Sequence, residues 1–233
     1  MAGDVALIVT AAGEGSRMGA DVRKPFLEIC GAPVLHRTLE RFTRVEGIFQ
    51  TILALHPEDY ERREEILSAA RPLGATDASP GGSCRSETVE NALGAVSERA
   101  GIVLIHDAVR PFVSAGVVEG VIEAARRSGA AIAAARPADT VKRAEGVAVV
   151  ETLPREALFL VQTPQGFRAE VIKRAYARRA GREFTDDAAL VEEAGGRVEV
   201  VESGRLNFKI TTVEDLELAR AVFGAARTGR LQF

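Results

Sequence analysis

Short continuous apolar runs alternate along this chain with stretches in which apolar residues recur at helical spacing. The runs at residues 5–9, 51–55 and 102–105 are typical of strands buried on both faces of a sheet. Strands are also expected over residues 130–135 and 197–201, and helices over residues 34–42, 57–70, 86–96, 117–127 and 213–223. Because strands and helices follow one another in turn, the pattern predicts an α/β fold with a mostly parallel, Rossmann-like sheet flanked by helices.

One stretch, residues 139–154, breaks this alternation. Two β-prone segments, at residues 140–143 and 147–153, lie on either side of a turn at Gly146. A glycine turn between two such segments predicts a β-hairpin. The polar flanks indicate an arm at about residues 138–156 that projects from the body and packs on another subunit, although a solvated hairpin at the sheet edge fits the same pattern.

Composition narrows the class of protein. The chain has 233 residues, 46% hydrophobic and 27% charged, which suits a single globular domain over residues 1–233. A formal net charge of −3 offers no basic field for nucleic acid. We expect no membrane segment, because no apolar run approaches the roughly 20 residues that a spanning helix needs. The start of the chain lacks a signal-peptide pattern, and Cys30 and Cys84 form no CxxC pair, so we expect a cytoplasmic protein with reduced thiols.

The strongest local signal directly follows the first expected strand. It reads Ala11-Ala12-Gly13-Glu14-Gly15-Ser16-Arg17-Met18-Gly19. Small residues let backbone N–H groups approach phosphate oxygens, and ligands of parallel sheets bind at the carboxyl ends of strands. Met18 stands where a dinucleotide fingerprint has its third glycine, and Lys24 precedes a proline, so a P-loop also fails. A glycine loop with its own cations, Arg17 and Lys24, remains, or else a solvated surface turn.

This loop resembles the signature of nucleotidyltransferases that activate sugars and polyols. Six further motifs, in the same order, resemble those of the 2-C-methyl-D-erythritol 4-phosphate cytidylyltransferase family and span nearly the whole chain. They are Gly81-Gly82-Ser83-Cys84-Arg85-Ser86-Glu87-Thr88-Val89, His106-Asp107-Ala108-Val109-Arg110-Pro111, Asp139-Thr140-Val141-Lys142, Thr163-Pro164-Gln165, Phe184-Thr185-Asp186-Asp187 and Asn207-Phe208-Lys209-Ile210-Thr211. The chain departs from the usual pattern at Pro25, Ser83 and Thr88, where the family usually has Gln, Asp and Ser.

The resemblance implies a nucleotidyltransferase-type fold and transfer of a cytidylyl group from CTP to a small polyol phosphate. A phosphomonoester is largely dianionic at neutral pH, so the attack needs no general base, but the accumulated negative charge needs cations and a metal ion such as Mg²⁺. By resemblance, Arg17 and Lys24 stabilise the triphosphate, while Arg155 and Lys209 hold the acceptor phosphate. In the family the arm carrying Arg155 reaches into the partner's site, which implies a homodimer. The expected substrate contacts are Ala11, Ala12, Gly13, Gly15, Gly81, Gly82, Ser83, Arg85, Thr88, Asp107, Ala108, Arg110, Thr140 and Thr185.

Some assignments stay open at the level of sequence. Asp107 ends an apolar strand, where a carboxylate suits a magnesium ion or a ribose hydroxyl, but it could equally cap a helix or pair with Arg110. Arg85 could be structural, and His106 is expected to form hydrogen bonds without transferring a proton. A ribitol 5-phosphate cytidylyltransferase shares most of these motifs. An NAD-dependent oxidoreductase and a non-catalytic nucleotide-binding homologue are alternatives of other classes.

Overall fold

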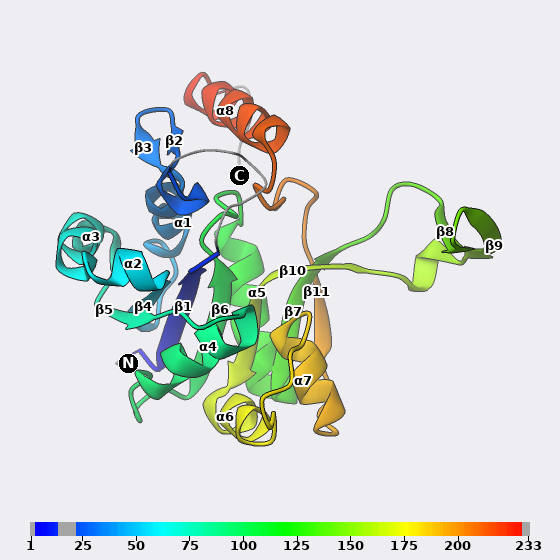
Figure 1. Cartoon of the computed structure of the whole chain (residues 1–233), viewed down its shortest axis with the longest axis horizontal. Helices are drawn as coiled ribbons and strands as arrows, with labels where there is room; N and C mark the ends of the chain where they lie inside the picture. The colour runs from blue at the N-terminus through cyan, green and yellow to red at the C-terminus, as the bar shows by residue number, and fades with distance from the viewer. Residues whose placement is uncertain (1–2, 14–21, 230–233) are drawn as a thin grey trace.

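A central sheet organises the molecule. The computed structural model describes residues 3–13 and 22–229, and within them seven strands form one sheet in the order β11-β7-β10-β6-β1-β4-β5 (Figure 1). The strands are β1 (Val5–Ala11), β4 (Ile48–Leu55), β5 (Asp77–Pro80), β6 (Ile102–Asp107), β7 (Ala130–Ala135), β10 (Leu160–Arg168) and β11 (Glu199–Glu202). All pairs except those of β10 are parallel. The expected mostly parallel α/β sheet is therefore confirmed.

Strand β10 is the exception, because it lies between β6 and β7 and runs antiparallel to both. The sequence analysis did not anticipate this strand. Gln162, Thr163, Pro164 and Gln165 interrupt its apolar run, and its register against β7 shifts over this stretch. The polar residues are nevertheless buried, because their side chains bond to neighbouring elements: the Gln165 side-chain oxygen, for instance, accepts from Asp187 N at 3.1 Å.

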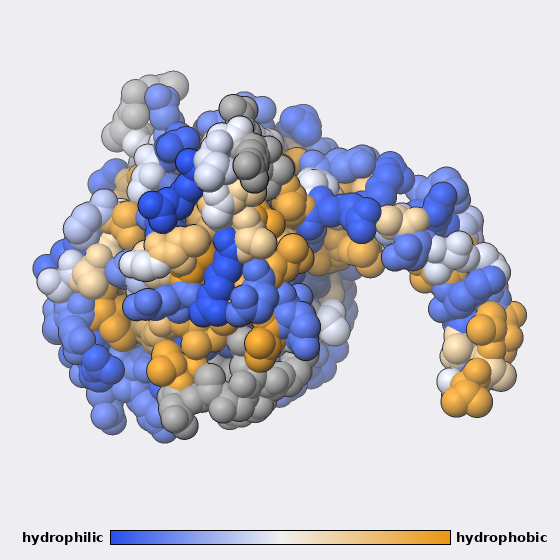
Figure 2. Space-filling view, turned by 90° about the horizontal axis from the view of Figure 1, so that it is seen from above, coloured by the Kyte–Doolittle hydropathy of each residue, from blue (hydrophilic) through white to orange (hydrophobic). Residues whose placement is uncertain are grey.

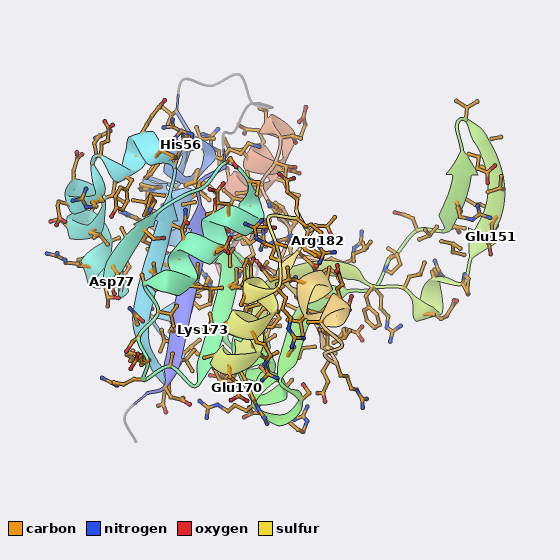
Figure 3. The ribbon with its side chains drawn as sticks, turned by 60° about the horizontal axis from the view of Figure 1, so that its bottom comes forward. His56, Asp77, Glu151, Glu170, Lys173 and Arg182 are labelled. Atoms are coloured by element: carbon orange, nitrogen blue, oxygen red, sulfur yellow. The ribbon has the colours of Figure 1, made fainter. Side chains whose placement is uncertain are left out.

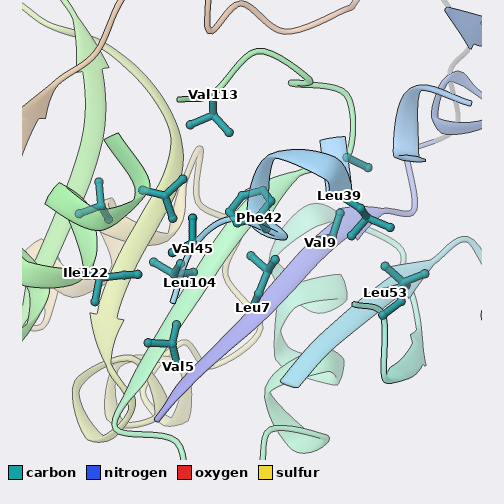
Figure 4. Close-up of a cluster of buried hydrophobic side chains, with 14 of the residues drawn as sticks. Val5, Leu7, Val9, Leu39, Phe42, Val45, Leu53, Leu104, Val113 and Ile122 are labelled. Atoms are coloured by element: carbon teal, nitrogen blue, oxygen red, sulfur yellow. The ribbon is translucent and has the colours of Figure 1, made fainter. Parts of the chain in front are cut away.

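Helices cover both faces of the sheet. The helices are α1 (Val34–Phe42), α2 (Pro57–Tyr60), α3 (Arg63–Ala70), α4 (Arg85–Gly94), α5 (Ala115–Ser128), α6 (Ala169–Ala177), α7 (Asp187–Glu193) and α8 (Val213–Arg227). Leu7 and Val9 of β1 pack with α1, α3 and α5 on one face (Figure 4), whereas Ala6 and Ile8 pack with α4, α6 and α7 on the other. This two-sided burial is the reason that β1 is a continuous apolar run.

The stretch expected as one helix over residues 57–70 is two helices, which corrects the sequence analysis. Helix α2 makes a single turn, and Arg62, with φ −101° and ψ 19°, departs from helical geometry before α3 begins. Helix α8 packs apart from the sheet, over the short hairpin of β2 (Glu28–Ile29) and β3 (Ala32–Pro33), where Phe223 contacts Phe112.

The expected hairpin arm is present and projects far from the body (Figures 1 and 2). It consists of β8 (Val141–Glu145) and β9 (Ala148–Leu153), joined at Gly146, whose φ of +59° lies in the left-handed region that glycine tolerates. The strands are linked by polar contacts such as the Arg143–Glu151 ion pair. Val147 and Val149 are exposed near the end of the arm, where Figure 2 shows a hydrophobic patch.

Strands β1, β4, β5 and β6 are parallel neighbours, so their carboxyl ends meet at one edge of the sheet. The register sets Thr10 beside Asp107, Ala11 beside Leu55, and Leu55 beside Pro80. The loops that follow these four strands therefore converge. Among the described residues, no helix is long and apolar enough to cross a membrane.

Candidate active site

A cavity of about 660 Å³ opens where the four carboxyl ends converge. Such a volume lies within the range of small-molecule sites, about 300–1,000 Å³. Eleven of the residues expected from the sequence line it: Ala11, Ala12, Gly13, Lys24, Gly81, Gly82, Ser83, Arg85, Thr88, Asp107 and Lys209. Figure 3 shows His56, another lining residue, at the cavity end of the molecule, while Glu170 and Lys173 lie toward the opposite end.

Asp107 lies at the centre of a group of cations. Its Oδ2 atom is 3.0 Å from Arg110 Nε and 3.1 Å from Lys209 Nζ, and its Oδ1 atom is 4.0 Å from Arg85 Nε. Burial acts to raise the pKa of this carboxyl, but the three cations hold the pKa well below its ordinary value. Asp107 is therefore ionised at neutral pH, and the pairing with Arg110 that the sequence left open is present.

The two lysines of the cavity come from opposite ends of the sequence. Lys24 opens the short 3-10 helix η2 (Lys24–Phe26), in which Pro25 is buried, and its Nζ atom donates to Thr211 O at 2.8 Å. Thr211 is held in turn by Asp215, which accepts from the Thr211 N–H at 2.8 Å and caps α8. The start of α8 thus positions the Lys24 contact and the Lys209 segment together. Two ammonium groups in one cavity suit a polyanionic ligand.

His106 is buried beneath the cavity. Its Nε2 atom lies 3.1 Å from Arg110 O, and its Nδ1 atom lies 3.1 Å from Thr163 Oγ1. Burial lowers the pKa of His106 to about 4, so the imidazole is neutral at physiological pH. These contacts agree with the expectation that His106 forms hydrogen bonds.

Arg85 joins the cavity to the neighbouring helices. Its Nη2 atom donates to Asp187 Oδ2 at 2.7 Å, and Tyr176 Oη donates to Asp187 Oδ1 at 2.6 Å. Burial and Asp187 raise the pKa of Tyr176, so this hydroxyl remains a donor. The guanidinium of Arg85 therefore has a structural partner in Asp187 as well as a place in the cavity lining.

The loop between β5 and α4 forms one wall of the cavity. Gly81 N donates to Leu55 O at 2.6 Å, Gly82 N to Thr88 Oγ1 at 3.0 Å, and Ser83 N to Glu87 Oε2 at 2.7 Å. A Cβ atom on Gly81 would lie 2.5 Å from that of Ala12, so only glycine lets this loop lie against the loop after β1. The two glycine-containing loops are therefore packed together, as binding of one ligand by both requires.

Several expected site residues lie elsewhere. Ala108 is buried and Arg110 is half-buried, and neither lines the cavity; Arg110 Nη1 donates to Asn207 O at 2.9 Å. Thr185 is exposed and does not line the cavity. Thr140 and Arg155 belong to the exposed arm, and Arg155 Nη1 donates to Ala138 O at 2.7 Å. The expected residues Gly15 and Arg17 lie outside the described residues.

The cavity also contains residues that the sequence analysis did not assign to the site. They are Thr10, Pro25, His56, Pro57, Cys84, Glu87, Val109, Ile210 and Thr211. Position after a strand is the signal that could have revealed Thr10 and His56, because both lie at the carboxyl ends of strands. Glu87 follows Ser83 by four residues, and the bend that brings their side chains together is a property of the folded loop.

The fold and the site define an α/β nucleotidyltransferase: a mostly parallel sheet carries two small-residue loops and a pair of lysines at its carboxyl edge. The family model for IspD, 2-C-methyl-D-erythritol 4-phosphate cytidylyltransferase, matches residues 5–225. The chain belongs to this family.

Individual relatives agree over nearly the whole length. The chain is 42% identical to the 2-C-methyl-D-erythritol 4-phosphate cytidylyltransferase of Geobacillus kaustophilus over 220 residues, which are 94% of this chain and 96% of that protein. It is also 42% identical to the Pelotomaculum thermopropionicum enzyme of the same name, with 97% of each covered. Among solved structures, the 4-diphosphocytidyl-2C-methyl-D-erythritol synthase of Anaerococcus prevotii superposes with a TM-score of 0.82 at 32% identity, covering 95% of this chain and 99% of that one. The Thermus thermophilus cytidylyltransferase gives 0.76 at 38% identity, covering 96% and 100%.

Proposed function

We propose that this chain transfers the cytidylyl group of CTP to 2-C-methyl-D-erythritol 4-phosphate. A phosphate oxygen of the acceptor attacks the α-phosphorus of CTP, and a new P–O bond forms. The bond from the α-phosphorus to the oxygen bridging to the β-phosphate breaks, and pyrophosphate leaves with the electron pair. The products are 4-diphosphocytidyl-2-C-methyl-D-erythritol and pyrophosphate. Because the acceptor dianion is already a nucleophile, no side chain has to remove a proton.

The observation that carries this proposal is the meeting of Lys24, Lys209 and the Gly81–Ser83 loop in one cavity. The lysines supply positive charge where a triphosphate and a second phosphate must approach each other. The loop supplies backbone groups at the part of the cavity without lysines. We assign Lys24 to the triphosphate, together with Arg17, which lies outside the described residues. We assign Lys209 to the acceptor phosphate.

A divalent cation such as Mg²⁺ fits this donor set only as a partner of the nucleotide. No group of three or more metal-ligating side chains is found in the described part of the chain. Mg²⁺ commonly binds one or two carboxylates together with substrate phosphates. Asp107 Oδ2 is taken by Arg110 and Lys209, whereas Oδ1 has only longer contacts with the described residues, such as Thr10 Oγ1 at 3.4 Å. Asp107 would hold the cation through Oδ1, and the cation would supply charge neutralisation at the phosphates.

The working enzyme in this proposal is a cytoplasmic homodimer of single-domain chains joined through the arm at residues 138–156. The exposed side chains of Val147 and Val149 support burial against a second copy. Arg155 and Thr140 lie on this arm and do not line the cavity of their own chain. We propose that they complete the acceptor site of the partner, where Arg155 would bind the acceptor phosphate.

Pyrophosphate release tests the reaction. The purified chain is incubated with CTP and Mg²⁺, with 2-C-methyl-D-erythritol 4-phosphate in one series and ribitol 5-phosphate in the other. Release with methylerythritol phosphate alone is the expected result. Release with ribitol 5-phosphate alone would keep the chemistry and reassign the acceptor, and no release with either would contradict the proposal.

A further inference from the structure

We infer that Glu87 is a positioning residue for the nucleotide base, because it holds the Gly81–Ser83 loop in a form in which none of the three backbone N–H groups is free to donate to a ligand. Such a wall offers no backbone donor to the carbonyl oxygen that uracil carries where cytosine has its amino group. The inference deepens the proposed function and rests on it.

The contacts of Glu87 are unusual for its place in a helix. It is the third residue of α4, and a glutamate at this position commonly reaches back to the backbone N–H of the N-cap residue. Here Glu87 Oε2 instead accepts from Ser83 N at 2.7 Å and from Ser83 Oγ at 2.5 Å, one residue before the N-cap. The cap itself is the weak acceptor Cys84 Sγ, 3.5 Å from Glu87 N. The Glu87 carboxylate therefore bonds to the loop instead of capping α4, and the Cys84 sulfur is the side-chain acceptor at the start of the helix.

Gly82 is what lets the Glu87 side chain cross to Ser83. A Cβ atom on Gly82 would lie 2.3 Å from Glu87 Cγ and 2.5 Å from Glu87 Cβ. The side chain of Glu87 thus lies directly on the backbone of the loop. The bonds to Ser83 also keep the pKa of Glu87 below its ordinary value, so the carboxylate is charged at neutral pH.

Every backbone donor of this loop is used within the protein. The N–H groups of Gly81, Gly82 and Ser83 donate to Leu55 O, Thr88 Oγ1 and Glu87 Oε2. The carbonyl oxygens of the same three residues accept no hydrogen bond from the part of the chain that the structure describes. Gly81, Gly82 and Ser83 all line the cavity, and none of their backbone N–H groups is free to donate to a ligand there. Without Glu87, the Ser83 N–H would become a free donor that uracil could use.

The distribution of charge places the base at this wall. Lys24 Nζ bonds to Thr211 O and Lys209 Nζ pairs with Asp107, so both ammonium groups lie along the segment before α8. The triphosphate belongs with them. The Gly81–Ser83 loop contains no basic residue. The uncharged base is therefore the part of the nucleotide that faces the loop.

The test is a comparison of CTP with UTP. Values of kcat and KM are measured for both nucleotides with wild type, Glu87→Ala and Glu87→Gln, and CTP binding is measured by calorimetry without acceptor. We expect Glu87→Ala to lower the CTP-to-UTP ratio of kcat/KM by about 10-fold or more, the scale of one lost hydrogen bond to a charged group. The effect should lie in KM and in CTP affinity, with kcat at saturating CTP retained. Glu87→Gln keeps an acceptor oxygen and should fall between wild type and Glu87→Ala.

Glu90→Gln, an exposed acid of the same helix, is the matched control and should leave the ratio unchanged. If Glu87→Ala does not fold by circular dichroism, Glu87→Gln decides, with a lowered ratio expected. Wild type that prefers CTP, combined with folded Glu87 variants that keep the full preference, would overturn this inference and leave the proposed function intact. Wild type that uses no CTP would overturn both.

Discussion

At the scale of single residues, His106 couples the stability of the fold to pH. Burial lowers its pKa to about 4, compared with about 6.5 in an unfolded chain. Between these values the unfolded state binds a proton that the folded state excludes, so stability is complete above about pH 6.5 and is lost as the pH falls. Asp107 acts in the same direction at lower pH, since its pKa is also lowered by folding. We expect the free energy of unfolding to drop by about 2 kcal/mol between pH 7 and pH 5 from His106 alone.

Urea unfolding at pH 7 and pH 5 measures this loss. His106→Gln is the informative variant, because it removes the titrating group while keeping a hydrogen-bonding side chain. Its absolute stability will differ from that of wild type, so the comparison is made between the two pH slopes. A His106→Gln chain as steeply sensitive to pH as wild type would show that another group carries the effect.

At the scale of elements, one buried carboxylate joins three helices. Asp187 begins α7 and bonds to Arg85 of α4 and Tyr176 of α6. We expect Asp187→Asn to destabilise the fold by about 3 kcal/mol, because it leaves the Arg85 charge without its nearest partner. Glu193→Gln, also in α7, is the control: it removes an exposed ion pair with Arg182, which lies before the helix, and should cost under about 1 kcal/mol. Equal losses in urea unfolding would mean that Asp187 does not tie these helices together.

The elements that the sequence predicted are those in which the spacing of apolar residues reveals the buried face. Helix α1 occupies residues 34–42 as expected, and its apolar positions face the core. Strands β5 and β10 were missed, because their pairing depends on neighbours distant in sequence and their side chains include Asp77, Gln162 and Pro164. The spacing of apolar residues indicates which face of an element is buried, whereas the order of strands in the sheet depends on contacts between residues that are distant in sequence.

Site residues likewise fall into those that could be expected from the sequence and those that depend on contacts in the folded protein. Asp107 ends a strand that the sequence predicted, so its place at the carboxyl edge of the sheet follows from the strand pattern. Gly81 was expected only from the family resemblance, because β5, the strand before it, was missed. The hydrogen bonds from Ser83 to the Glu87 carboxylate could not be anticipated, since they depend on the close approach of the Glu87 side chain to the Gly82 backbone. Arg110 was expected at the substrate, and this stays a prediction: Arg110 does not line the cavity, and its side chain bonds to Asp107 and to Asn207 O.

At the scale of the whole molecule, the projecting arm leaves two alternatives for Arg155: it acts in the cavity of its own chain or in that of a partner chain. In the proposed C2 dimer, each site combines Lys24 and Lys209 of one chain with Arg155 of the other. Lys24→Ala alone should lower turnover about 10²-fold, the scale for one preorganised transition-state donor. We expect a similar loss for Arg155→Ala.

Co-expression of these two variants with different tags separates the possibilities. In the mixed dimer, the Arg155→Ala chain keeps its own Lys24 and receives Arg155 from the Lys24→Ala chain, so one intact site is restored. Random pairing of the two chains should return about a quarter of wild-type activity. Lys24→Ala mixed with Lys209→Ala is the matched control, because both changes lie in the cavity of their own chain and no site is repaired. Recovery in the first mixture alone would place Arg155 across the dimer interface, whereas no recovery in either would place it in its own chain's site or outside the reaction.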